Sequence, residues 1–336
     1  MKTDSLFWSI LIVAFIINLS LPQTSYSQSD KDRQEATMFV YNCGFGGITA
    51  GVGAVINKRK QEHILPTFWR GFKYGALGGL INYGSKRIDY LITKYTDYPY
   101  ICPNTNTSND AALLWAWPVR IVHSVGTSII ENAAANKPNV FQDYNMPIGF
   151  VNLSVSIKNK IVVKPQLMPF SFGSFLSVLF NLTTLNNSSC LNEKSTFKLK
   201  ESLLLGTPYF SVNSLPINSN VNYNRANYNG GLNVYGTILA DSYYDNSNFA
   251  GHIKAHELIH SLQDEDYLVF NQYLNKPYNR IIHRNKKVIK VLERYIHPDI
   301  PYFDAFYITM PKGDDEFTNF YEREAEHFST NRYVSP

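Results

Sequence analysis

The sequence predicts an α+β fold, because helical and strand-like patterns occupy separate parts of the chain instead of alternating. Long apolar stretches rich in glycine fill the first third and predict helices. Segments with alternating apolar and polar residues begin near residue 145 and predict a central antiparallel sheet. From about residue 248 the apolar spacing is helical again, so we expect C-terminal helices. A chain of 336 residues is long enough to bury a substantial core.

The composition is that of a globular protein, with 44% hydrophobic and 17% charged residues and a net charge of +4. The basic residues are scattered, apart from short clusters at residues 58–60 and 284–287. Clusters of this length are typical of solvated surfaces, so we expect no nucleic-acid partner.

Residues 1–27 have the pattern of a secretory signal peptide. Lys2 gives a positive start, residues 6–21 form an apolar core, and small and polar residues lead up to Ser27. An uncleaved anchor is the alternative, because the apolar core is near the upper length for a signal peptide. Both interpretations place the rest of the chain outside the cytoplasm, as a periplasmic or secreted protein with membrane association left open.

Residues 28–140 are predicted to form a Gly-rich helical region. Residues 36–57 carry no charge and contain a G-x-x-x-G step, and residues 68–92 repeat glycine after a basic turn. We expect a hairpin of two helices whose glycines let the backbones approach closely. Charged residues interrupt the second arm, so a buried hairpin, or one lying on a membrane surface through residues 36–84, is favoured over two membrane spans.

A third apolar stretch, residues 111–136, predicts another helix that Pro118 interrupts. His123 is expected to be a buried histidine with hydrogen-bond partners, because no acid or oxyanion signature accompanies it. The three cysteines, Cys43, Cys102 and Cys190, cannot all pair within the chain, and one disulfide with one free thiol would suit an oxidising compartment.

Residues 141–336 are predicted to form the α+β domain. We expect strands within residues 150–167, 197–213 and 231–244, separated by Asn-rich loops at 181–193 and 217–230. Helices are expected within residues 249–274, 279–296 and 315–333.

The first of these C-terminal helices carries the motif H-E-x-x-H, formed by His256, Glu257 and His260. Positions i and i+4 lie on one face of a helix, so both imidazoles can bind one ion. Glu257 then lies one step round the helix, beside a water in the site, which is the arrangement of a zinc hydrolase.

A catalytic zinc site needs a third protein ligand. Position 266 is Asp, which excludes a histidine six residues after the second one. The C-terminal sequence YEREAEHF offers Glu322 as the third ligand and Glu326, one turn later, as an acceptor for the free N–H of a ligating histidine. Glu324 remains an alternative ligand. Small Ala325 would let this helix approach the H-E-x-x-H helix closely.

The two motifs, at residues 251–267 and 318–329, resemble those of zinc metallopeptidases of the gluzincin type. The resemblance implies that His256, His260 and Glu322 bind Zn²⁺, that Glu257 is the general base, and that the substrate is a peptide or protein. It covers a small part of the chain, and Glu326 stands where that family usually has Asp.

The sequence therefore predicts an extracytoplasmic zinc-dependent hydrolase, a metallopeptidase that uses zinc-activated water with Glu257 as general base. The alternative is a non-enzymatic envelope or membrane-associated protein with a structural or degenerate zinc site. Glu257 favours catalysis, since a structural site has no need of it. The strand before the motif helix could pair with an extended peptide. An oxyanion donor is also expected, and the candidates are Tyr267, Tyr307, His283, His297 and His327.

Overall fold

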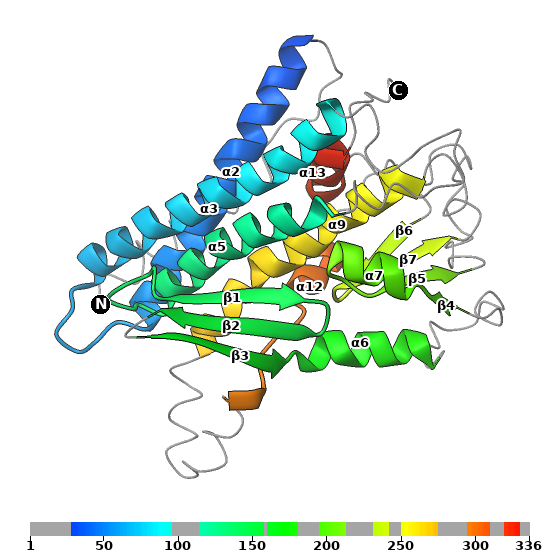
Figure 1. Ribbon diagram of the computed structural model, residues 1–336. Coiled ribbons are helices and arrows are strands. Elements are labelled where there is room, and N and C mark those ends of the chain that lie inside the picture. Colours follow the sequence, from blue (N-terminus) through cyan, green and yellow to red (C-terminus); the bar gives the residue numbers. More distant parts are fainter. Residues whose placement is uncertain are drawn as a thin grey trace. The chain divides into compact units, whose positions relative to one another are not determined.

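The computed structural model describes residues 28–95, 114–157, 160–180, 195–212, 231–241, 250–274, 294–309 and 319–329. The chain divides into two units, residues 1–37 with 335–336 and residues 38–334, and the contacts described below lie within the second. Its fold is α+β as predicted, with helices before and after two small sheets (Figure 1). The predicted signal peptide, both Asn-rich loops, Cys102, Cys190, His283 and most of the helix expected at 279–296 lie outside the described residues.

Two long helices, α2 (Gln28–Ile56) and α3 (Ile64–Tyr95), form the predicted hairpin. Their backbones touch where glycine is the only residue that fits. A Cβ at Gly75 would overlap the carbonyl oxygen of Gly46, and a Cβ at Gly79 would overlap the backbone of α2 in the same way. The expected close approach of the two helices is thus confirmed.

One described helical stretch, Gln34–Ile56, is long and apolar enough to cross a membrane. Half of its most apolar window is buried inside the protein, and a core helix passes the same test of length and composition. The hairpin also buries charged and polar side chains, among them Lys86 and Asn42. These observations agree with the expectation of a hairpin that packs within the protein.

Helix α5 (Ala116–Ala134) packs along α3 and contributes Ile129, Ile130 and Ala133 to a shared apolar cluster. The expected interruption at Pro118 is wrong. Pro118 lies in the first helical turn, where backbone N–H groups have no helical acceptor, so the ring breaks no hydrogen bond.

His123 of α5 is fully buried, and both ring nitrogens have partners. Its Nδ1 is 3.0 Å from Ser85 Oγ and its Nε2 is 2.9 Å from the carbonyl oxygen of Leu262. The prediction of a buried, hydrogen-bonded histidine is confirmed.

The first sheet is an antiparallel meander of β1 (Asp143–Ile148), β2 (Val151–Ile157) and β3 (Ile161–Leu167). Its register pairs Met146 with Leu153 and Val155 with Val163. The expected antiparallel strands in this part of the chain are confirmed.

The second sheet has the order β4-β5-β7-β6, and its bounds are β4 (Thr196–Phe197), β5 (Tyr209–Val212), β6 (Gly231–Val234) and β7 (Thr237–Asp241). Strands β5 and β7 are parallel, so the expectation of a wholly antiparallel sheet is wrong. Between β3 and β4, helix α6 (Pro169–Leu179) begins with a proline in its first turn.

The prediction of a strand over residues 197–213 is also wrong for the middle of that range. Residues Leu199–Leu205 form the short helix α7, which ends at Gly206 in the left-handed conformation, with φ of 68°. The leucines and Glu201 are good helix formers, and glycine at this position terminates a helix without steric cost. In this sheet β7 lies between β5 and β6, parallel to β5 and antiparallel to β6.

The C-terminal part begins with α9 (Ala250–Tyr267), which continues as the 3-10 helix η3 (Leu268–Leu274). Helices α12 (Tyr302–Thr309) and α13 (Phe320–Ser329) follow, and both pack on α9. Ala325 is fully buried against Ile259 and Leu262 of α9, so the expected close approach of the two helices is confirmed.

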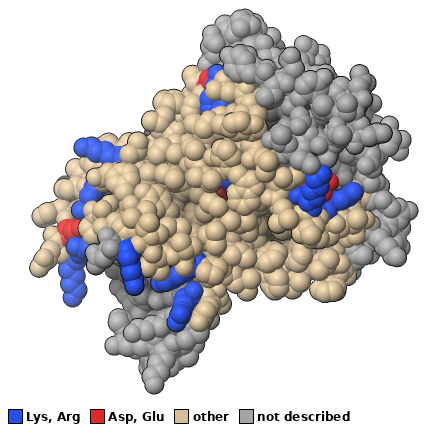
Figure 2. Space-filling view, viewed as in Figure 1, with Lys and Arg blue, Asp and Glu red and all other residues tan. Residues whose placement is uncertain are grey.

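Charged side chains are few on the face of the molecule seen in Figure 1. Figure 2 shows lysines and arginines mainly toward its edges, separated by a broad uncharged area. Several carboxylates of α9 and α13 are instead buried, namely Glu257, Glu265, Asp266, Glu322 and Glu324. Burying a charge is costly unless the charge is paired, so this group of buried carboxylates indicates a functional site at α9 and α13.

Candidate metal centre

Three predicted ligands come together between α9 and α13. His256 and His260 lie one turn apart on α9, and their Nε2 atoms are 3.1 Å apart. Glu322, in the first turn of α13, places Oε2 3.1 Å from His256 Nε2 and 3.4 Å from His260 Nε2. All three side chains are buried. Among the described residues this is the one group that could hold a metal ion.

The spacing of the three donor atoms fits a small tetrahedral ion. Donors about 2.1 Å from a zinc ion at tetrahedral angles are about 3.4 Å apart. The observed separations of 3.1, 3.1 and 3.4 Å are close to that value. Two imidazoles and one carboxylate also make up a known catalytic donor set, which leaves the fourth position open.

The three groups are electrostatically coupled. Burial alone would lower the pKa of His256, but hydrogen bonding and Coulomb attraction, chiefly from Glu322, raise it well above the ordinary value. Burial would raise the pKa of Glu322, yet the attraction of His260 and His256 holds it well below its usual range. The carboxylate is therefore anionic and attracts a cation into the cluster, and a bound metal ion would replace a proton there.

Each candidate ligand has a polar neighbour on its other side. Tyr307 of α12 donates a hydrogen bond of 2.6 Å to Glu322 Oε1. Gln263 Oε1 is 2.7 Å from His260 Nδ1. Glu326 Oε2 is 3.7 Å from His256 Nδ1, which is the side of the ring where the sequence suggested that Glu326 would lie. Such neighbours fix the orientation of ligands.

Glu324, the alternative ligand, points elsewhere. It is fully buried and accepts hydrogen bonds from Asn42 Nδ2 at 2.7 Å and Gln263 Nε2 at 2.8 Å, and Lys86 Nζ is 3.1 Å away. Its oxygens are thus engaged by the hairpin and by Gln263. The structure brings Glu322, and not Glu324, to the two histidines.

Glu257 is buried on a neighbouring face of α9, with 2% of its surface exposed. Burial raises the pKa of its carboxyl group, while the positive charge of the two histidines opposes the shift. Oε2 has no hydrogen-bond partner in the part of the chain that the structure describes. A buried carboxylate beside the ligands, with one oxygen unengaged, is suited to accept a proton.

The face of α9 that carries Glu257 also carries Ser261 and Asp264, because these positions follow the helical period. The β6–β7 hairpin is attached to this face. Asn233 Nδ2 donates to Ser261 Oγ at 3.0 Å, and the backbone N–H of Gly236 donates to Asp264 Oδ2 at 3.3 Å. Strand β6 is the end strand of the second sheet, and it contacts the side of α9 that carries Ser261.

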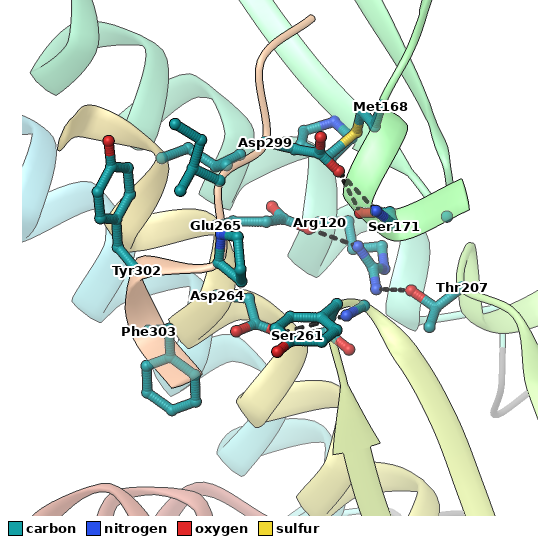
Figure 3. Close-up of a pocket in the computed structure, with 17 residues that line it drawn as sticks. Arg120, Met168, Ser171, Thr207, Ser261, Asp264, Glu265, Asp299, Tyr302 and Phe303 are labelled. Atoms are coloured by element: carbon teal, nitrogen blue, oxygen red, sulfur yellow. Dashed lines mark hydrogen bonds and ion pairs between the residues drawn. The ribbon is translucent and has the colours of Figure 1, made fainter. Parts of the chain in front are cut away.

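A cavity of about 50 Å³ opens farther along the same face of α9 (Figure 3). Arg120 lies within it, donating to Glu265 Oε1 at 2.6 Å and to the Thr207 hydroxyl. Phe303 lines the cavity, and its ring centroid is 6.5 Å from that of His260. Phe303 therefore lies near both the cavity and His260, while the described lining of the cavity includes none of the three candidate ligands. Its labelled lining residues are Arg120, Met168, Ser171, Thr207, Ser261, Asp264, Glu265, Asp299, Tyr302 and Phe303.

Of the candidate oxyanion donors in the described residues, only Tyr307 contacts the cluster. The hydroxyl of Tyr267 bonds to that of Tyr321, and the ring of His327 stacks on Tyr90 with centroids 5.6 Å apart. His297 is buried, and its backbone N–H donates to the carbonyl oxygen of Leu167 on β3.

Sequence reasoning missed Gln263 and Lys86. Gln263 could have been found, because it lies three residues after His260 on the same helical face. For Lys86 the sequence holds no such signal, since it comes from α3, far away along the chain. Comparison of the chain with protein-family models, with curated proteins and with solved structures found no match.

Proposed function

We propose that this protein is a zinc-dependent hydrolase, a metallopeptidase of the gluzincin type. The observation that carries the proposal is the convergence of His256, His260 and Glu322 within tetrahedral spacing, with Glu257 buried beside them. The donor set of two imidazoles and one carboxylate, together with the second carboxylate next to the first ligand, is what hydrolysis at zinc requires.

His256, His260 and Glu322 would hold the zinc ion, which when bound supplies Lewis acidity toward a carbonyl oxygen and toward water. Glu257 accepts the proton of the attacking water and delivers it to the leaving nitrogen. Tyr307, which donates to Glu322, supplies a hydroxyl beside the centre that could stabilise the oxyanion of the substrate.

The surroundings of the centre support an extended peptide as substrate. Strand β6 lies at the end of its sheet next to the Glu257 face of α9, and a peptide can add to such an edge through main-chain hydrogen bonds. The cavity farther along α9, with Asp264, Glu265 and Asp299 in its lining, offers a place for a substrate side chain.

The alternative function is a non-enzymatic envelope protein with a structural metal site. Glu257 argues against it. A buried carboxyl group whose Oε2 has no described partner destabilises the fold, and a purely structural site would gain nothing from it. Burial also raises the pKa of this carboxyl group, and a perturbed pKa beside a possible metal site is a common property of functional residues.

We also propose that the protein acts outside the cytoplasm at a membrane surface. Helix α3 exposes large apolar side chains, including Leu65 at 57%, Trp69 at 49% and Leu80 at 44%, and the basic residues 58–60 precede its first turn. An apolar face flanked by basic residues is suited to an anionic membrane surface. Sedimentation of the protein with anionic vesicles, and its loss in Trp69→Ser, would test this proposal.

The function itself is tested by metal analysis and an unbiased cleavage profile. Purified protein should contain one zinc per chain and cleave members of a mixed peptide library. A chelator should abolish cleavage, and added zinc should restore it. Protein that holds zinc but cleaves no peptide would favour the structural alternative, and protein that binds no zinc would refute both versions.

A further inference from the structure

The second histidine of the candidate centre is connected to the N-terminal hairpin by a continuous chain of hydrogen bonds. His260 Nδ1 is 2.7 Å from Gln263 Oε1, and Gln263 Nε2 donates to Glu324 Oε2 at 2.8 Å. Lys86 Nζ donates to the same carboxylate oxygen at 3.1 Å. Every side chain in this series is buried, and those of Lys86 and Glu324 have no exposed surface at all.

The direction of the Gln263 amide follows from its partners. Its NH₂ group donates to Glu324 Oε2 and also to the carbonyl oxygen of Tyr321, at 3.1 Å. Both partners are acceptors, so the reverse orientation would set the amide oxygen against two other oxygens. Gln263 Oε1 must therefore face His260, where it can only accept a hydrogen bond. The proton of neutral His260 then lies on Nδ1, and Nε2 is left with a lone pair that faces His256 and Glu322.

Lys86 keeps this arrangement charged. Its three N–H donors have three acceptors, which are Asn42 Oδ1, Asp266 Oδ2 and Glu324 Oε2, each at 3.1 Å. Burial alone would lower the pKa of Lys86, but attraction from Asp266 and Glu324 raises it above the ordinary value. The ammonium group thus balances the buried carboxylate to which the Gln263 amide donates.

We propose that Gln263 is a positioning residue for the metal centre, and that the Lys86–Glu324 ion pair sets its orientation and so holds His260 in the tautomer that binds metal through Nε2. This inference rests on the proposed function, because it assigns a role at the same centre. It makes the α2–α3 hairpin part of the support of the metal site.

The test compares zinc affinity in three variants of the full chain, measured by competition with a chelator. Gln263→Met should weaken zinc binding by about 10–100-fold, the usual effect of removing a partner of a metal ligand. Glu324→Gln is isosteric and leaves Lys86 paired with Asp266. It removes the charged one of the two acceptors that orient the Gln263 amide and leaves the Tyr321 carbonyl oxygen, so it should weaken binding by about tenfold. The double variant should bind zinc no more weakly than Gln263→Met, since Glu324 acts through Gln263.

Asp266→Asn is the matched control. It removes the other carboxylate of Lys86 but leaves Gln263 and Glu324 in place, so it should lower stability without changing zinc affinity. In zinc-loaded protein with ¹⁵N-labelled histidine, the His260 signals should show a protonated Nδ1, whose proton exchanges faster with water in Gln263→Met. If the losses of zinc affinity in Gln263→Met and Glu324→Gln were additive in the double variant, Glu324 would not act through Gln263, and this part of the inference would be wrong.

Wild-type zinc affinity in both Gln263→Met and Glu324→Gln would overturn the inference while leaving the proposed function intact. A wild-type chain that binds no zinc would overturn both. If Asp266→Asn weakened zinc binding as much as Glu324→Gln, the effect would be general destabilisation and the inference would again be wrong.

Discussion

His256 Nε2 lies 3.1 Å from Glu322 Oε2, although 66 positions separate the two residues in the chain. The contact joins helix α9 to helix α13 and completes a buried set of two imidazoles and one carboxylate. In a hydrolase of the proposed kind this pair would share one metal ion, which gives the first prediction.

Replacing Glu322 by Gln should remove most of the zinc-binding capacity. The amide keeps the size of the side chain but lacks the negative charge that attracts the ion, so the loss of affinity should exceed about 100-fold. Glu326→Gln is the control. Its carboxylate is 3.7 Å from His256 Nδ1, outside the ligand set, and its loss should cost about tenfold. Zinc retained by Glu322→Gln after dialysis would show that the ligand assignment is wrong.

The close packing of α2 on α3 predicts opposite effects for two glycines of the same helix. In Gly75→Ala the added Cβ would overlap Gly46 O and Ala50 Cβ, and overpacking of this kind costs about 1–3 kcal/mol or more. Among the described residues, no atom outside the helix's own nearby backbone and the two chain neighbours lies within 4 Å of a Cβ at Gly84, so Gly84→Ala should stabilise the helix by about 0.5–1 kcal/mol. Thermal unfolding of both variants tests this, and equal melting temperatures would contradict it.

Buried His297 predicts acid lability. Burial lowers its pKa from 6.5 to about 4 in the folded protein. Between pH 6.5 and pH 4, His297 is therefore protonated in the unfolded chain but neutral in the folded protein. The free energy of unfolding should fall as the pH is lowered through this range, by about 3 kcal/mol in all. His297→Gln cannot bind that proton and should lose this part of the pH dependence. Urea unfolding of both proteins from pH 7 to pH 4 is the measurement, and parallel pH profiles would speak against the prediction.

The position of Tyr307 predicts a kinetic effect. If its hydroxyl stabilises the oxyanion, Tyr307→Phe should lower kcat by about 10²–10³-fold, with a smaller change in KM. The variant keeps the ring, which packs 5.9 Å from that of Phe303, so folding should persist. Unchanged kcat in a zinc-loaded variant would show that Tyr307 is not the oxyanion donor.

Local patterns in the sequence predicted the parts of the site that depend on one helix. The spacing of His256 and His260 suffices to place them on one face, because helical geometry fixes that relation. The convergence of Glu322 with them was predicted through the resemblance, since no local rule brings α13 to α9. The choice between Glu322 and Glu324 depended on the neighbours that each buried carboxylate meets, because both side chains are buried. Glu322 meets the histidines of α9, whereas Glu324 meets Lys86 and Asn42 of the hairpin.

The errors have physical causes of the same kind. Alternation in residues 197–213 suggested a strand, but the leucines of α7 pack as a helix, with Leu205 in a cluster that includes Tyr209 and Ile238. The parallel pairing of β5 with β7 depends on a crossover that no single segment encodes. In the sequence, nothing distinguishes Lys86 from a surface lysine. Its two ion-pair partners, Asp266 of α9 and Glu324 of α13, come close to it only because α3 packs near both helices.

The most direct test of the central claim is to measure bound zinc and peptide cleavage together in Glu257→Gln. Glu257 is not a ligand, so the variant should fold and hold as much zinc as the wild type. Its amide cannot accept a proton from water, and cleavage should fall by about 10²–10⁴-fold. His256→Ala, measured beside it, should lose both zinc and cleavage. Undiminished cleavage by a zinc-loaded Glu257→Gln protein would contradict the proposed mechanism.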